Sequence, residues 1–141
     1  FLCQQRLKQP YYGFWGRLGG KVRWGESFEE AATRELLEET NLDASFTYKM
    51  MFRKRDYRKS TGALLEDKVS ELSHKVFVIM YTNDASGELM VDFEGGHNEW
   101  LTQDAFIAKD KTFESARQFI ELIDNDVPYY SGTYEYDDTE Y

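Results

Sequence analysis

The chain has 141 residues, of which 26 are acidic and 17 are basic, and its formal net charge is −9. This balance gives no attraction for a nucleic-acid backbone or an anionic membrane, so we expect neither a polymeric nucleic acid nor a membrane as a partner. The length fits one domain. The single cysteine excludes an intrachain disulfide framework and suits a cytoplasmic protein. The longest apolar run, 76–81, is too short to cross a bilayer.

The first residues, Phe1–Arg6, are typical of the end of a strand, and proline and glycines predict a loop over 8–19. This loop is rich in aromatic residues, namely Tyr11, Tyr12, Phe14 and Trp15. Either one of them stacks on a nucleobase, for which we name Tyr12, or they cover a sheet edge, which we favour for Trp15.

A helix is predicted over Phe28–Thr40. Ser27 is a good N-cap, and Glu29 and Glu30 place negative charge in the first turn, where the helix dipole favours it. No proline or glycine interrupts the segment, and Asn41 tolerates the left-handed conformation that ends many helices.

One stripe of this helix is apolar in its first turns, at Phe28 and Ala31, and carboxylate in its last turns, at Glu35, Glu38 and Glu39. A solvated charged face would lie opposite the apolar one. Clustered carboxylates disfavour one another's ionisation, and a hard divalent cation relieves this because it takes oxygen ligands and bridges to phosphates. The stripe therefore indicates a metal site.

The alternative is a surface helix whose glutamates pair with Arg34 and with lysines at helical spacing. Two consecutive glycines, Gly19 and Gly20, precede the helix and let the backbone approach a ligand closely. Their position favours the metal site.

The stretch Gly20–Leu42 resembles the Nudix box, G-x5-E-x7-R-E-U-x-E-E-x-G-U, where U is a bulky aliphatic residue. The matching positions are Gly20, Glu26, Arg34, Glu35, Leu36, Glu38, Glu39 and Leu42. Asn41 replaces the late glycine, and Leu18 stands where the family commonly has proline. The resemblance implies an α/β/α sandwich with a mixed β-sheet between helices, formed by a single domain over 1–125 and followed by an acidic, tyrosine-rich tail over 126–141.

The resemblance also implies metal-dependent hydrolysis of a pyrophosphate bond in a nucleoside diphosphate linked to a moiety X, with Mg²⁺ or Mn²⁺ as the cofactor. Glu26 and Arg34 would form an ion pair that orients the carboxylates. Which glutamate is the general base stays open. The implied metal ligands are Glu35, Glu39, Glu38 as a further ligand or holder of water, and a backbone carbonyl of Gly19 or Gly20.

After the box, alternation predicts a strand over 44–55 with one face formed by Phe46, Tyr48, Met50 and Phe52. The basic run that follows either neutralises substrate phosphates, through Arg53 and Arg55, or is the solvated tip of a hairpin, which we favour. We expect a loop or short helix over 60–73. The segment 76–81 is apolar on both faces and is predicted to lie in the middle of a covered sheet.

Turn residues are expected at 83–87, with a short strand over 88–93. The resemblance places an additional acidic residue near the metals in the next segment, and Glu94 and Glu99 are the candidates, each with a surface carboxylate as the alternative.

At the end of the chain, Thr112 is predicted to cap a helix over Phe113–Asp124 with a core-facing apolar stripe. The tail docks on its own domain, docks on a second subunit as a homodimer, or stays loose; the sequence leaves these three placements open.

We favour an oxidised or ordinary nucleoside triphosphate as the substrate, because the domain is small and plain. Family members that favour ADP-ribose often have a proline shortly after the box, and this proline is absent here. Members that favour dinucleoside polyphosphates often have a tyrosine near that position. Tyr57 either matches this tyrosine or is an ordinary strand residue. A sugar nucleotide stays open. Three other function classes remain: a nucleotide-binding sensor that does not hydrolyse, a structural interaction module built on the tail, and a hydrolase of another class. The last is disfavoured because no Ser-His or Cys-His arrangement is visible. The retained box glutamates favour the enzyme.

Overall fold

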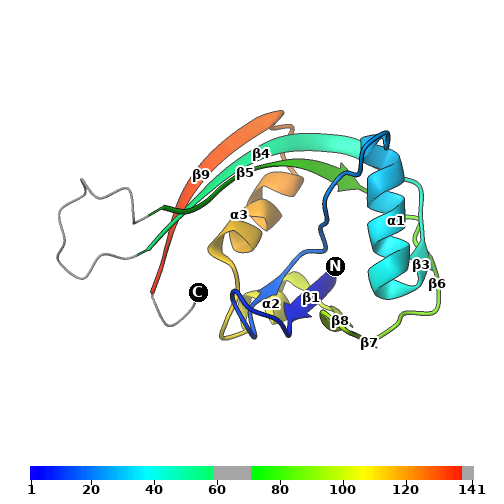
Figure 1. Ribbon diagram of the computed structural model, residues 1–141, viewed down its shortest axis with the longest axis horizontal. Helices are drawn as coiled ribbons and strands as arrows, with labels where there is room; N and C mark the ends of the chain where they lie inside the picture. The colour runs from blue at the N-terminus through cyan, green and yellow to red at the C-terminus, as the bar shows by residue number, and fades with distance from the viewer. Residues whose placement is uncertain (59–70, 138–141) are drawn as a thin grey trace.

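The computed structural model describes residues 1–58 and 71–137, and Figure 1 shows how their strands and helices are arranged. One sheet has the strand order β2-β1-β8-β7, and its strands are β1 (Leu2–Arg6), β2 (Trp15–Gly16), β7 (Asp92–Phe93) and β8 (Gly96–Trp100). A second sheet has the order β5-β4-β9 and consists of β4 (Thr47–Arg58), β5 (Glu71–Tyr81) and β9 (Tyr129–Tyr136). A small two-stranded sheet joins β3 (Leu42–Asp43) to β6 (Ser86–Gly87).

Helices cover both faces of the sheet that contains β1 and β8. On one face, Gln4 and Asn98 reach Glu39 on α1 (Phe28–Thr40). On the other face, a buried cluster joins the sheet to α2 (Gln103–Ile107) and α3 (Glu114–Ile123), and its members are Cys3, Trp15, Leu101, Phe106, Ala116 and Ile120. The predicted packing of helices on both sides of a sheet is confirmed. Trp15, which we expected to cover a sheet edge, lies on the edge strand β2 and is buried in this cluster.

Helix α1 has the predicted limits and the predicted caps. Ser27 Oγ accepts from the backbone N–H of Glu30, and the Glu30 carboxylate accepts from the N–H of Ser27, which forms a capping box. Asn41 ends the helix with φ at 59°, in the left-handed region. Local sequence therefore decides where this helix begins and ends.

Strands β4 and β5 depart from the prediction in two ways. Strand β4 begins at Thr47 rather than at residue 44, and a register shift between Tyr48 and Met50 leaves Tyr48 exposed while Met50 is buried. Strand β5 is an edge of its sheet in the described part of the chain, with Val76 58% and Phe77 37% exposed. The prediction of a central, covered strand over 76–81 is wrong, because apolar faces alone do not say how many neighbours a strand has.

The loop or helix predicted over 60–73 lies mostly outside the described residues, and its last residues, 71–73, belong to β5.

A lysine and an aspartate continue the buried face of β4. Lys54 Nζ lies 3.0 Å from Asp56 Oδ1, and Ser73 Oγ donates to Asp56 Oδ2 at 2.8 Å. Lys54 also lies over the ring of Phe113, with 5.0 Å between Nζ and the ring centroid. Burial lowers the pKa of Lys54, and the carboxylate of Asp56 opposes this shift.

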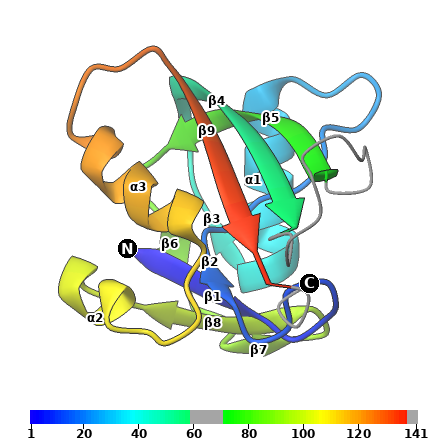
Figure 2. The ribbon, with the colours of Figure 1, turned by 90° about the vertical axis from the view of Figure 1, so that its left-hand side faces the viewer.

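The C-terminal tail adds a strand to the fold. Residues of β9 pair in parallel with β4 from Met51 to Arg58, and Figure 2 shows the two arrows side by side and pointing the same way. Tyr134 and Tyr136 are buried in a cluster with Tyr11, Phe14 and Phe52. Of the three placements that the sequence left open, the structure shows docking of residues 129–136 on their own domain.

The predicted final helix is present, but its cap differs. Thr112 Oγ1 donates to the carbonyls of Phe106 and Lys109, and the N-cap position of α3 is Phe113, without a side-chain cap hydrogen bond. The strand expected over 88–93 is reduced to β7. None of the described helices is long and apolar enough to cross a membrane.

Candidate active site

Arg34 ties the loop before α1 to the helix. Its Nε donates to Glu26 Oε1 at 2.5 Å and its second amino group to Glu26 Oε2 at 2.9 Å, a bidentate pair, while the same second amino group donates to the Lys21 carbonyl at 2.9 Å. Hydrogen bonds hold the pKa of Glu26 at about 2; the bond from the Arg34 side chain contributes most, followed by the bond from the backbone N–H of Arg23. The predicted Glu26–Arg34 pair is therefore present in the structure.

Two arginines hold the carboxylates of Glu35 and Glu38. Arg34 donates to Glu35 Oε1 at 2.6 Å and to Glu38 Oε2 at 3.3 Å. Arg23, in the loop before the helix, donates to Glu38 Oε1 at 3.0 Å. The Glu35 side chain is 19% exposed and that of Glu38 is 47% exposed. Arg34 thus lies against two of the three stripe carboxylates and Glu26, as expected of a residue that orients them.

Glu39 has a different environment. Its carboxylate is half buried and accepts a hydrogen bond from Gln4 Nε2 at 2.8 Å. Burial raises the pKa of Glu39; the hydrogen bond from Gln4 opposes this shift, and the neighbouring charges of Glu35 and Glu38 add to it. No ion pair to Glu39 is present among the described residues. Its negative charge is the least compensated of the stripe.

The backbone of Gly20 passes directly over Glu35. A Cβ built on Gly20 would overlap Cδ and both carboxylate oxygens of Glu35, whereas a Cβ on Gly19 would meet no heavy atom within 4 Å. Only a glycine allows this close approach at position 20. The paired glycines predicted to border the site therefore have different surroundings.

The stripe carboxylates offer the oxygen ligands that a hard divalent cation takes. In residues 1–58 and 71–137, no three histidine, cysteine or acidic side chains converge on a point that could hold a metal ion, because Glu35 and Glu38 face arginines and Glu39 faces Gln4. The oxygen chemistry of the stripe, and the charge of Glu39 that no ion pair among the described residues offsets, nevertheless match what Mg²⁺ or Mn²⁺ binds. Of the sequence-predicted ligands, the structure brings Glu35 together with Gly20.

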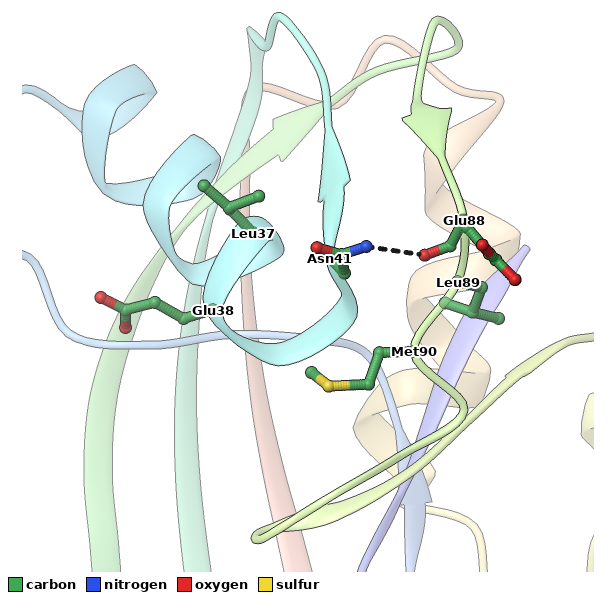
Figure 3. A pocket seen from close by; sticks show the side chains of 6 residues that line it. All are labelled: Leu37, Glu38, Asn41, Glu88, Leu89 and Met90. Atoms are coloured by element: carbon green, nitrogen blue, oxygen red, sulfur yellow. Dashed lines mark hydrogen bonds between the residues drawn. The ribbon is translucent and has the colours of Figure 1, made fainter.

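A surface groove of about 570 Å³ borders Glu38 at the end of α1 (Figure 3). Leu37, Leu89 and Met90 give it an apolar lining, and Asn41 Nδ2 closes one side by donating to the carbonyl of Glu88 at 3.2 Å. Glu38 lines the groove from the helix, and Figure 3 shows its carboxylate pointing away from Leu89 and Met90.

The two additional acidic candidates lie apart from the α1 carboxylates. Glu99 shares a face of the sheet with its partner Cys3, and its carboxylate accepts from Lys109 Nζ at 2.9 Å. Strand alternation turns Asn98, not Glu99, toward α1. Glu94 is exposed and pairs with Lys8 at 2.6 Å, and this hydrogen bond lowers the pKa of Glu94. The structure does not bring either residue to the stripe.

The predicted substrate-binding residues on β4 also point elsewhere. Arg53, Arg55 and Tyr57 alternate with the buried residues of the strand, so they lie on its outer face, while Figure 1 shows α1 and α3 beneath the opposite, concave face. Arg53 Nε donates to His74 Nε2 at 2.8 Å, and Arg55 donates to Thr133 Oγ1 at 3.2 Å. Tyr12 is 53% exposed in the loop after β1. These assignments remain predictions.

Three residues at the site were missed from the sequence: Gln4, Arg23 and Asn98. Arg23 lies inside the box, at a position where any residue is allowed, so the motif gives no signal for it. Gln4 and Asn98 face α1 only because β1 pairs with β8. Alternation within a correctly placed β8 would have separated Asn98 from Glu99.

Comparison with known protein families identifies the class of this fold and of the stretch Gly20–Leu42. The model of the NUDIX domain matches residues 1–123, which is most of the chain. The chain therefore belongs to the Nudix family. The fold agrees with that of the mutator MutT protein from Bacillus halodurans, with a TM-score of 0.72 and 21% sequence identity over 99% of this chain and 84% of that chain.

Two further proteins are similar. The oxidized purine nucleoside triphosphate hydrolase of Danio rerio is 50% identical over 38 residues, which are 27% of this chain and 24% of that protein. The aligned part thus spans about a quarter of that relative's length. A NUDIX hydrolase from Nitrosomonas europaea has a TM-score of 0.49 and 16% identity over 96% of this chain and 70% of that chain.

Proposed function

We propose that this protein is a pyrophosphohydrolase that cleaves a nucleoside diphosphate linked to a moiety X, with Mg²⁺ or Mn²⁺ as its cofactor. The observation that carries the proposal is the set of carboxylates Glu35, Glu38 and Glu39 on one helix, two of them contacted by Arg34 and one bordered by the close backbone of Gly20. Membership of the Nudix family supports it.

The residues have distinct roles in this proposal. Glu35, Glu38 and Glu39 hold the cation, which supplies charge neutralisation for the phosphates and a lowered pKa for the attacking water. Arg34 and Glu26 fix the position of the helix carboxylates relative to the glycine loop. Arg23 donates a hydrogen bond to Glu38 from the loop before the helix, and its positive charge would lie beside the phosphates.

A nucleoside triphosphate is the favoured substrate. The Danio rerio relative, named as an oxidized purine nucleoside triphosphate hydrolase, supports this choice over its aligned segment. We place the organic part of the substrate in the groove beside Glu38, because Leu37, Leu89 and Met90 offer it apolar surface at the end of the helix that carries the carboxylates. ADP-ribose, sugar nucleotides and dinucleoside polyphosphates are the competing substrates.

The test is nucleoside-monophosphate and phosphate release from a panel of these four substrate classes with Mg²⁺ or Mn²⁺. Glu38→Gln and Glu39→Gln should each lower turnover by ~100-fold, the scale expected when a metal-holding group is lost. Glu29→Gln, in the exposed first turn of the same helix, is the matched control and should retain turnover. No turnover of any substrate, with nucleotide binding intact, would overturn the enzyme and leave a nucleotide sensor.

A further inference from the structure

Asn98 is a buried polar residue that joins three segments of the chain. It is 1% exposed on β8, and its Nδ2 donates to the Glu39 carbonyl at 2.7 Å and to the Met90 carbonyl at 2.8 Å. The Glu39 carbonyl lies in the last turn of α1, where no intrahelical donor reaches it. Asn98 therefore satisfies the end of the carboxylate helix from a neighbouring strand.

The two carbonyls fix the orientation of the Asn98 amide. A carbonyl oxygen only accepts, so the group that faces both of them must be the NH₂, and Oδ1 must point the other way. That oxygen faces Gln4, which lies directly across from Asn98 in the β1–β8 pair. The orientation follows from the bonding partners.

The Asn98 oxygen in turn fixes the orientation of Gln4. Gln4 Nε2 lies 3.3 Å from Asn98 Oδ1 and 2.8 Å from Glu39 Oε2. Both neighbours are acceptors, so Gln4 must present its NH₂ to them. The network thus aims one N–H donor at one oxygen of Glu39, and among the described residues the other carboxylate oxygen, Oε1, makes no hydrogen bond.

We infer that Gln4 is a positioning residue for the Glu39 carboxylate and that Asn98 holds Gln4 in the orientation that does this. This inference rests on the proposed function, because it takes Glu39 as a group that binds the cation. Residues that orient a metal-binding side chain from behind commonly change metal affinity by ~10–100-fold when they are removed. A free glutamate on a helix has several rotamers, and this hydrogen bond selects one of them.

Gln5 provides a matched control for Gln4. It is the next residue on β1, it is equally a half-buried glutamine, and its Nε2 donates to the Gly13 carbonyl at 3.1 Å, on the opposite face of the sheet. Replacement by methionine keeps the length of either side chain and removes its hydrogen bonds. Gln4→Met therefore removes an amide from the face of the sheet toward α1, and Gln5→Met removes one from the opposite face.

The experiment measures Mn²⁺ binding to the nucleotide-free protein by electron paramagnetic resonance, together with the kcat and KM of the substrate that is turned over. Gln4→Met should raise the Mn²⁺ dissociation constant by ~10–100-fold and lower kcat more than it changes KM, while Gln5→Met leaves both unchanged. Asn98→Leu should also raise the Mn²⁺ dissociation constant, and combining it with Gln4→Met should raise this constant little further, because Asn98 reaches the Glu39 carboxylate through Gln4.

A metal-independent readout completes the test. In the ¹⁵N spectrum of the metal-free protein, the side-chain NH₂ signal of Gln4 should shift in Glu39→Gln and stay unchanged in Glu29→Gln. Wild-type Mn²⁺ binding that is identical in Gln4→Met would overturn the inference alone. No Mn²⁺ binding by the wild type, with Glu39→Gln equally inert, would overturn the proposed function and the inference with it.

Discussion

A methyl group added at Gly20 would displace one side chain of the site, that of Glu35. The Cβ of Gly20→Ala would overlap the carboxylate of Glu35, whereas the Cβ of Gly19→Ala would meet nothing within 4 Å. To restore van der Waals contact, the Glu35 carboxylate must move by roughly 1 Å or more. The two alanine variants thus differ in whether Glu35 keeps its place.

The expected effect is large on activity and small on stability. A displacement of ~1 Å in a group that positions the reaction can lower the rate by ~100-fold. The group that moves is the end of a side chain, and an alanine restricts the unfolded chain more than a glycine does, which offsets the clash by ~0.4–1 kcal/mol. We therefore expect kcat/KM to fall by ~100-fold in Gly20→Ala, with a change below ~1 kcal/mol in the free energy of unfolding.

The assay is steady-state hydrolysis of the substrate identified in the panel, with urea unfolding on the same preparations. Gly19→Ala should retain the kcat/KM of the wild type. Equal kcat/KM values in Gly19→Ala and Gly20→Ala would refute the argument, because they would show that the position of Glu35 under the glycine backbone has no consequence for the reaction.

Three more outcomes follow from the contacts. Hydrogen bonds hold the pKa of Glu26 at about 2, below its ordinary 4.5. The pair of Glu26 with Arg34 therefore stabilises the fold above pH 4.5, and this stabilisation is lost as the pH falls through about 2. The thermal midpoints of the wild type and Glu26→Gln should converge between these pH values, and a constant difference would contradict the assignment. Lys54→Met leaves the buried Asp56 without its cation and should lower the free energy of unfolding in urea by ~3–5 kcal/mol. The double variant Lys54→Met/Asp56→Leu should recover most of this loss, and a double variant as unstable as the single one would argue against the pair. Leu89→Ala removes apolar surface from the groove beside Glu38 and should raise KM by ~10-fold at unchanged kcat, whereas an unaltered KM would place the organic part of the substrate elsewhere.

The helix and its carboxylate stripe follow from the sequence because their causes are local. The capping box joins residues three apart, the left-handed residue directly follows the last turn, and the 3.6-residue period alone places Glu35, Glu38 and Glu39 together. The pair between Glu26 and Arg34 spans only eight residues, and the motif specifies both partners. No distant part of the chain is needed to build these features.

The surroundings of the stripe depend on pairings between distant segments. The contacts of Gln4 with Glu39 and Asn98 join residues 35 and 94 positions apart, and a shift of one residue in β8 would have turned Glu99 toward α1 instead. In the same way, Lys54 is buried because β9 adds Tyr134 and Tyr136 to the side of β4, an association that the alternation of β4 does not encode. The sequence alone determined which side chains the helix carries. The tertiary structure decided which amides and cations face those side chains, because packing between segments that are far apart in the chain sets strand register and strand neighbours.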